Sequence, residues 1–234
     1  MVIAIIILVI GLAGLILFLI SRAKKGYCVQ GAIIKSVVSF IFICLAAYSN
    51  YHSGGHLFGV YALMGLAVGL LGDIFLELKC VYKQHDEILT YAGFAAFFIG
   101  HIFYIVGMIR EFYHGQNFLY LVLPLLFGIM MGGVVIFMEK PLKLKYGKMK
   151  IIVGAYGVIL FSMAFLAVSL CIMNRFHNVP LILLGAGGIL FALSDLVLSG
   201  MYFGGENDKV PNMILNISLY YTAQYLIAFS LFFL

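Results

Sequence analysis

The sequence predicts an all-α integral membrane protein with eight transmembrane helices, and three observations support this class. First, hydrophobic residues make up 65% of the 234 residues and charged residues only 10%, with a mean hydropathy of +1.15. Soluble chains carry roughly 25% charged residues, so this composition excludes both a water-soluble globule and a disordered chain. Second, long apolar runs recur along the chain, and third, the basic residues are concentrated in alternate gaps between them.

The apolar runs have the length of about 20 residues that a helix needs to cross a bilayer. They leave only short loops, so we expect a single polytopic membrane domain over residues 1–234. The eight expected spans are 2–20, 33–49, 57–78, 91–109, 118–138, 151–173, 181–201 and 213–234.

The first span is followed, and not preceded, by basic residues: Arg22, Lys24 and Lys25 come directly after it. A secretory signal has the opposite polarity, so we expect a retained helix with its N-terminus outside. The second span is apolar apart from Lys35, which lies just inside its start.

The third span combines small and acidic residues on one face, since they follow each other at four-residue intervals. This face consists of Gly65, Gly69, Asp73 and Glu77. Small residues let a neighbouring helix approach closely, so the two carboxyl groups that continue the face should point into the bundle. In the fourth span, His101 and Tyr104 are three residues apart and share a face.

The fifth and sixth spans carry no charged residue, and the gap between them is rich in lysine. This gap is one of the odd-numbered loops, which together hold eleven of the 14 Lys and Arg residues, whereas the even-numbered loops hold only Arg110 and Arg175. The positive-inside rule therefore places the odd-numbered loops in the cytoplasm and both termini outside. The eleven residues are Arg22, Lys24, Lys25, Lys79, Lys83, Lys140, Lys143, Lys145, Lys148, Lys150 and Lys209.

The seventh and eighth spans again carry polar residues at helical spacing. The seventh repeats the design of the third, with Gly188, Ala192, Asp195 and Ser199 on one face. The eighth has Asn216, Tyr220 and Gln224 at four-residue steps, with Tyr221 beside them. Such residues at membrane depth are rare and usually functional.

The two aspartates should lie at similar depth. At a rise of 1.5 Å per residue, Asp73 and Asp195 are both about 8–9 Å inside the cytoplasmic boundary. His101, Tyr220 and Gln224 reach the same half of the bundle from helices that run the other way. We expect a polar cavity there, open to the cytoplasm or the inner leaflet; the structural alternative is a set of interhelical hydrogen bonds that only fix the packing.

The polar positions also suggest an internal repeat. Asp73 precedes His101 by 28 residues, Asp195 precedes Gln224 by 29, and the two aspartates are 122 residues apart. This spacing predicts two parallel four-helix halves related by an axis along the membrane normal. Superposition of the third and fourth spans on the seventh and eighth tests the hypothesis.

The sequence lacks the motifs of several common kinds of catalytic and binding site. The sequence has no GxSxG, HExxH, Walker or dinucleotide-binding pattern, and a single histidine at membrane depth does not make a three-ligand zinc site. We therefore expect neither a metal nor a cofactor. The formal charge of +5 is divided among short loops, so no nucleic-acid partner is expected.

Four motifs, in order along the chain, resemble those of the YhhN-like lysoplasmalogenase membrane family. They are Leu71-Gly72-Asp73 with Leu76, Gly100-His101 with Tyr104, Phe191-Ala192-Leu193-Ser194-Asp195 with Leu198, and Tyr220-Tyr221-Thr222-Ala223-Gln224 with Leu226-Ile227. The resemblance extends from about the second span to the last. The first span and the lysine-rich loop carry no matching motif.

The resemblance implies an eight-helix hydrolase of a bacterial cytoplasmic membrane. Its implied reaction cleaves the vinyl ether of an alkenyl lysophospholipid to a fatty aldehyde and a glycerophospho-ethanolamine or -choline, with Asp73 and Asp195 as the catalytic pair. The other polar residues are candidates for substrate binding or support of the pair: Glu77, His101, Tyr104, Ser194, Asn216, Tyr220, Tyr221 and Gln224.

Paired carboxyl groups suit this chemistry. Protonation of the outer alkene carbon gives an oxocarbenium ion, which water captures as a hemiacetal that collapses to aldehyde and alcohol. Two carboxyls in a water-poor site favour different protonation states, so one can donate the proton while the other stabilises the cation and accepts a proton from water. Lys79 and Lys83 at the cytoplasmic mouth are candidates to attract the phosphate.

Two other functions use the same features. Intramembrane carboxyls and parallel repeats also build proton-coupled transporters, which need a polar path to both faces. A lipid-binding protein without catalysis would need the cavity but would tolerate loss of one aspartate. The clustering of polar residues in one half of the bundle favours the hydrolase.

Overall fold

The computed structural model describes residues 1–115, 117–205 and 209–234, and within them it contains helices and short connections but no strand. Eight of the described helices are long and apolar enough to cross a membrane, which confirms the expected fold class. These helices are α1 (Val2–Lys25), α2 (Val29–His52), α3 (Leu57–Val81), α4 (Asp86–Phe112), α5 (Leu119–Phe137), α6 (Lys150–Met173), α7 (Val179–Phe203) and α8 (Val210–Ser230).

Most helices begin or end outside the spans expected from hydropathy. α4 begins at Asp86, because Asp86 and Glu87 place negative charge in its first turn, where the helix dipole favours it. α2 begins at Val29, where the Cys28 thiol accepts a hydrogen bond from the Gly31 amide at 3.4 Å and caps the helix. Hydropathy marks only the part of a helix that lies in hydrocarbon, and polar residues extend it into the interface.

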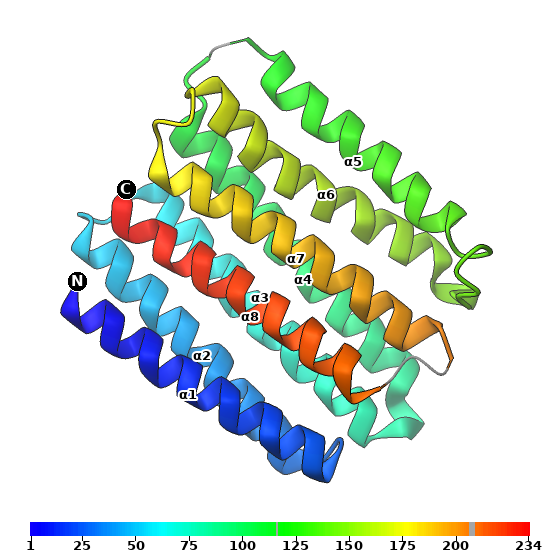
Figure 1. Cartoon of the computed structure of the whole chain (residues 1–234). Helices are drawn as coiled ribbons and strands as arrows, with labels where there is room; N and C mark the ends of the chain where they lie inside the picture. The colour runs from blue at the N-terminus through cyan, green and yellow to red at the C-terminus, as the bar shows by residue number, and fades with distance from the viewer. Residues whose placement is uncertain (116, 206–208) are drawn as a thin grey trace.

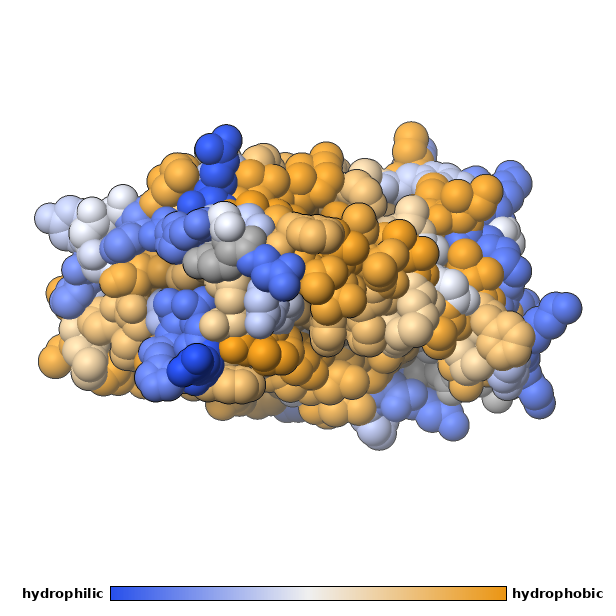
Figure 2. All heavy atoms as spheres, turned by 90° about the horizontal axis from the view of Figure 1, so that it is seen from above, coloured by the Kyte–Doolittle hydropathy of each residue, from blue (hydrophilic) through white to orange (hydrophobic). Residues whose placement is uncertain are grey.

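The helices run alongside one another, so their ends lie at two opposite ends of the bundle (Figure 1). Both termini lie at one end, and the α1–α2, α3–α4 and α5–α6 connections lie at the other, together with the C-terminal end of α7 and the N-terminal end of α8. Orange, apolar side chains predominate across the middle of the surface, whereas blue, polar ones gather toward the two ends (Figure 2). The alternation of basic loops requires an even number of spans with both termini at the same end of the bundle, and the helices have this arrangement.

Consecutive helices within each half pack as antiparallel pairs, namely α1–α2, α2–α3 and α3–α4 in one half and α5–α6, α6–α7 and α7–α8 in the other. α1 lies at one edge of the bundle and α5 at the other (Figure 1). α1 and α3 contact α8, but the halves meet mainly at two interfaces: α2 packs against α8, and α4 packs against α6. In each case the second helix of one half meets the fourth helix of the other. A two-fold axis along the bundle would generate this pattern; superposition of the halves remains the test of the repeat.

Glycines bring α3 close to α4 and so fix the position of Asp73. A Cβ atom added to Gly65 would lie 3.0 Å from the Gly100 carbonyl oxygen, and one added to Gly72 would lie 2.7 Å from the Phe97 ring. Backbones can approach this closely only where a side chain is missing. The small face of α3 therefore packs on α4 and orients the carboxyl groups inward.

Several basic residues that the sequence places in loops belong to α-helices instead: Arg22, Lys24, Lys25, Lys79, Arg110 and Lys150. Arg22 and Lys79 lie in the last turns of α1 and α3, where positive charge is favoured by the helix dipole. Arg22 is only 4% exposed, so it is a buried residue of the bundle and not a solvated topology signal.

Candidate active site

Asp73 lies on α3 and is held by groups from two other helices. Its Oδ1 lies 3.0 Å from the ammonium of Lys35 on α2, and its Oδ2 accepts hydrogen bonds of 2.7 Å from the hydroxyls of Ser39 on α2 and Tyr220 on α8. The residue is 2% exposed. A cation and two hydroxyl donors together stabilise the ionised carboxylate.

A chain of donors leads through the bundle to Asp73. The Tyr104 hydroxyl donates to Gln224 Oε1 at 3.5 Å, and Gln224 Nε2 donates at 3.0 Å to the Tyr220 hydroxyl, which donates to Asp73. The Tyr221 hydroxyl lies 2.9 Å from Ser39 Oγ. The structure therefore joins four residues predicted from the sequence, on α4 and α8, into the support of one carboxylate.

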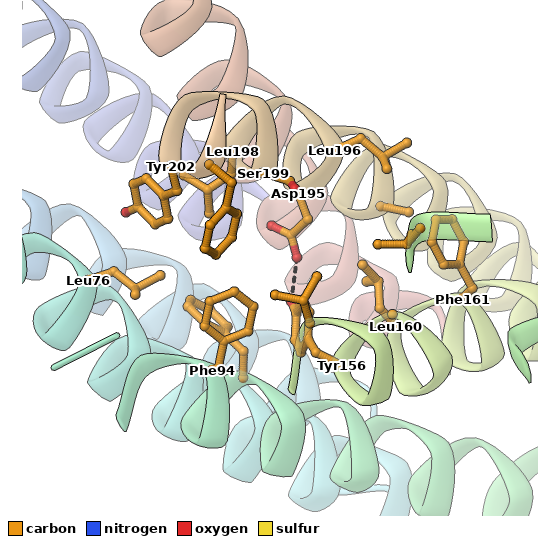
Figure 3. Close-up of a pocket in the computed structure, with 16 residues that line it drawn as sticks. Leu76, Phe94, Tyr156, Leu160, Phe161, Asp195, Leu196, Leu198, Ser199 and Tyr202 are labelled. Carbon is orange, nitrogen blue, oxygen red and sulfur yellow. Dashed lines mark hydrogen bonds between the residues drawn. The ribbon is translucent and has the colours of Figure 1, made fainter. Parts of the chain in front are cut away.

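Asp195 on α7 has a different environment. Among the described residues, its hydrogen-bond partner is the hydroxyl of Tyr156 on α6, which donates to Oδ2, and no cation pairs with it (Figure 3). Apolar and aromatic side chains such as Phe94 and Leu160 surround it (Figure 3). A half-buried carboxyl among apolar side chains, with a phenol partner and no paired cation, favours the neutral form.

Two adjoining cavities of opposite character meet at Asp195. One is walled by apolar side chains of α4, α6 and α7 such as Phe94, Leu160 and Phe161. The other is lined by polar groups that include Lys35 and Asp73. Asp195 lines both, as do Leu76, Phe97, Leu198 and Tyr202.

A line of alternating charges borders the polar cavity. Arg22 on α1 pairs with Glu77 on α3, Glu77 Oε2 lies 4.0 Å from Lys35 Nζ, and Lys35 pairs with Asp73. Glu77 is 4% exposed. The line contains two cations and two carboxylates, so the charges balance within the bundle.

Ser194 and Asn216 connect α7 to α8 at the wall of the polar cavity. Asn216 Nδ2 donates to the Ser194 carbonyl oxygen at 2.8 Å and lies 2.9 Å from its hydroxyl, and that hydroxyl donates to the Asn216 carbonyl at 3.1 Å. Both residues line the cavity, but they bond to each other and not to an aspartate. They position α7 and α8 next to the site.

His101 lies behind the site. Its Nδ1 is 2.6 Å from the Phe97 carbonyl oxygen, which makes Nδ1 the protonated nitrogen, and its buried Nε2 has no hydrogen-bond partner among the described residues. Its ring packs edge-on against Tyr156 and Phe191, with centroids 5.6 and 4.9 Å away. His101 therefore supports Tyr156 from behind and lines neither cavity.

Lys79 and Lys83 were expected to contact the substrate phosphate at the cytoplasmic mouth, but they do not line the polar cavity. The Lys79 ammonium lies 3.4 Å from Asp86 and 3.7 Å from the centre of the Tyr202 ring, and Lys83 starts a short 3₁₀ turn before α4. Within the described residues, no group of three or more His, Cys, Asp and Glu side chains could hold a metal ion.

The sequence analysis missed four residues of the site: Arg22, Lys35, Ser39 and Tyr156. Lys35 carried a signal, because a lysine within an apolar span is a candidate functional residue, and Ser39 follows it by one helical turn. Tyr156 carried none, since a tyrosine in an apolar helix is as compatible with packing as with hydrogen bonding.

The chain matches a model of a known protein family. The family model described as YhhN family matches residues 30–231, which leaves α1 outside the matched region. No curated protein and no solved structure gives a match to the chain.

Proposed function

The chain belongs to the YhhN family, and on this premise we propose that it is a membrane hydrolase of the lysoplasmalogenase type. Its substrate is an alkenyl lysophospholipid, and its products are a fatty aldehyde and a glycerophospho-ethanolamine or -choline. The family and the eight apolar helices make it a multi-pass membrane protein. We place it in a bacterial cytoplasmic membrane with both termini outside, so that the site lies in the inner half of the bilayer.

One observation carries the proposal: Asp195 lines a polar and an apolar cavity at once. A lysophospholipid has a polar headgroup and one hydrocarbon chain, and its vinyl ether joins the two. With the chain in the apolar cavity and the headgroup in the polar one, the vinyl ether lies beside Asp195. A soluble sugar or a peptide would leave the apolar cavity unfilled.

The environments of the two aspartates support different roles. Among the described residues no cation pairs with Asp195, so it keeps its proton and donates it to the outer carbon of the alkene as general acid. Asp73, ionised beside Lys35, stabilises the oxocarbenium ion that forms and accepts a proton from the attacking water. Glycosidases place two carboxyls around a similar cation.

The proton balance closes over the two carboxyls. Asp195 loses one proton to carbon, and Asp73 gains one from water as the hemiacetal forms. In the collapse of the hemiacetal, Asp73 returns its proton to the departing glycerol oxygen, and the hemiacetal hydroxyl gives its proton to Asp195. One water is consumed, the ether C–O bond breaks, and both aspartates return to their starting states.

The test is aldehyde release from an alkenyl lysophospholipid by the purified full-length chain in detergent. Asp195→Asn removes the acid, and Asp73→Asn removes the carboxylate. Asp86→Asn is the matched control, because the exposed Asp86 pairs with Lys79 and lines neither cavity. We expect release by the wild type and the control and none by the other two variants.

The same assay separates the alternatives. Near-wild-type release by Asp195→Asn would remove the acid–base pair. If folded wild-type protein releases no aldehyde, the fold and the family assignment still stand, but the vinyl ether reaction is excluded. Proton flux in liposomes would then decide between a carrier and a lipid-binding protein.

A further inference from the structure

Helix α1 contributes a buried charge to the polar cavity although it lies outside the region that the family model matches. Arg22, in its last turn, is 4% exposed and lines the cavity that contains Asp73 and Asp195. Its guanidinium lies between aromatic rings, 4.0 Å from the centre of Tyr27 and 5.3 Å from that of Phe18. A buried arginine needs partners for its donors.

The partners of Arg22 are incomplete. Glu77 pairs with one terminal nitrogen, whereas Nε is buried and has no hydrogen-bond partner among the described residues. A guanidinium with aromatic rings on its faces presents its donors at the edge of its plane. That edge suits the oxygens of a phosphate, which arginine binds with two parallel hydrogen bonds.

We propose that Arg22 is the phosphate-binding residue of the polar cavity, and that a phosphate ester takes the place of Glu77 against it. The inference rests on the proposed function, because it takes the phosphate to be that of a lysophospholipid headgroup. It adds α1 to the substrate site. Lys24 and Lys25, in the same turn, are exposed and line neither cavity.

Displacement of Glu77 has a consequence for Asp73. Glu77 Oε2 already lies 4.0 Å from Lys35 Nζ, so a Glu77 released from Arg22 gains Lys35 as its cation. The Lys35 ammonium then interacts with the carboxylates of both Glu77 and Asp73. Headgroup binding at the mouth thus loosens the ion pair that holds Asp73 and frees this carboxylate to accept a proton from water. The resting ion pairs keep the site inactive until a phosphate arrives.

The experiment measures binding and needs no turnover. The probes are a 1-O-alkyl lysophosphoethanolamine, which has no vinyl bond to protonate, and a 1-O-alkylglycerol with the same chain and no phosphate. Calorimetric titration of the full-length protein in mild detergent gives the ratio of the two affinities. We expect the wild type to prefer the phosphate-bearing lipid by about tenfold or more, as charge-assisted hydrogen bonds provide.

Arg22→Gln should reduce this preference to near unity and leave alkylglycerol binding unchanged. Lys24→Gln is the matched control, because it removes the same charge from the same helix turn at an exposed position. The double variant Arg22→Gln/Glu77→Gln removes both members of the pair, so it leaves no unpaired buried charge and tests the same loss in a balanced site. A preference retained by both Arg22 variants would overturn the proposal.

Glu77→Gln distinguishes binding from structure. If Glu77 competes with phosphate for Arg22, this variant should bind the phosphate-bearing lipid several-fold more tightly than the wild type. If the pair only holds α1 to α3, the variant should bind as weakly as Arg22→Gln, which contradicts the proposal.

The source of the phosphate is tested with soluble competitors. Failure of inorganic phosphate to displace the alkyl lysophospholipid supports a lipid headgroup, and displacement by inorganic phosphate alone overturns it. The experiments can also contradict the proposed phosphate-binding site and the proposed vinyl ether reaction independently of each other. An Arg22-dependent preference without aldehyde release would remove the vinyl ether reaction only, and release without that dependence would remove the Arg22 site only.

Discussion

Lys35 and Tyr156 lie at nearly the same sequence distance before the intramembrane aspartate of their own half of the chain, and each contacts that aspartate. Lys35 on α2 precedes Asp73 by 38 residues and lies 3.0 Å from it, whereas Tyr156 on α6 precedes Asp195 by 39 and donates a hydrogen bond to it. One aspartate therefore faces a cation and the other a phenol. The two halves of the chain thus give their carboxyls different electrostatic environments, which suits the two chemical roles proposed above.

Lys35→Met should destabilise the protein and abolish turnover. It leaves the Asp73 carboxylate buried without a cation, and breaking a buried ion pair costs about 3–5 kcal/mol. Thermal unfolding in detergent measures the loss. Lys35→Met/Asp73→Asn removes both charges, so it should recover most of the stability but none of the turnover. A single variant as stable as the wild type would contradict the ion pair.

Tyr156→Phe should lower kcat roughly tenfold with little change in KM, since one hydrogen bond to a carboxyl is worth about 1.5 kcal/mol. The hydroxyl orients Asp195, while the ring remains to fill its place beside Phe94. Tyr91→Phe removes an exposed hydroxyl that bonds Glu87 and serves as control. Steady-state aldehyde release gives both constants; an unchanged kcat would show that Asp195 needs no orienting partner.

Gly65→Ala should destabilise the bundle by about 1–3 kcal/mol. The new methyl group would lie 2.7 Å from the Tyr104 ring and 3.0 Å from the Gly100 carbonyl, so α3 and α4 must separate and Asp73 must shift. Gly133→Ala on α5 meets nothing within 4 Å and should be neutral or stabilising by about 0.5–1 kcal/mol. Unfolding of the two variants side by side checks the difference, and equal stability would contradict the close helix approach.

Phe161→Leu should shift the substrate preference toward longer alkenyl chains. Phe161 lies at the end of the apolar cavity away from Tyr202 (Figure 3), where a smaller side chain makes room for additional methylenes. Phe165→Leu, one turn further along α6 and stacked on Phe127 outside the cavity, is the control. The ratio of kcat/KM for a long and a short chain is measured. An unchanged ratio in Phe161→Leu would place the chain elsewhere.

Acid should loosen the connection between α5 and α6. A hydrogen bond from Lys150, and then one from the Tyr146 amide, lower the pKa of Glu139 below its ordinary 4.5. The carboxylate therefore stabilises this loop fully above pH 4.5, and the contribution is lost as the pH falls through the lowered pKa. Hydrogen exchange of the loop, corrected for intrinsic rates, should rise below pH 4.5 in the wild type. Glu139→Gln should show no such step.

The membrane fold could be predicted from the sequence because it depends on one strong signal. Runs of about 20 apolar residues define the spans without knowledge of tertiary contacts. The orientation that the asymmetry of lysine and arginine indicates stays a prediction. The inward face of α3 was also predictable, since its glycines and carboxyls share a helical period. The helix ends were not, because they depend on capping groups such as the Cys28 thiol.

The site was only partly predictable, because contacts between distant helices leave little trace in one sequence. Asp73, Tyr220 and Gln224 were found because polar residues are conspicuous in apolar spans, and they do meet. Arg22 was taken for a topology signal, since a basic residue at a helix end looks the same whether it is solvated or turned inward. Only the tertiary structure reveals that Glu77 lies opposite it.

The ion pair of Lys35 also bears on the fate of the product. A fatty aldehyde condenses with the free amine of a lysine to give a Schiff base, and the proposed reaction releases an aldehyde into the cavity that Lys35 lines. An ammonium held against a carboxylate has no lone pair with which to attack a carbonyl carbon. In the proposed reaction, the contact between Lys35 and Asp73 thus keeps this amine from condensing with the aldehyde made beside it, so the site is not consumed by its own product.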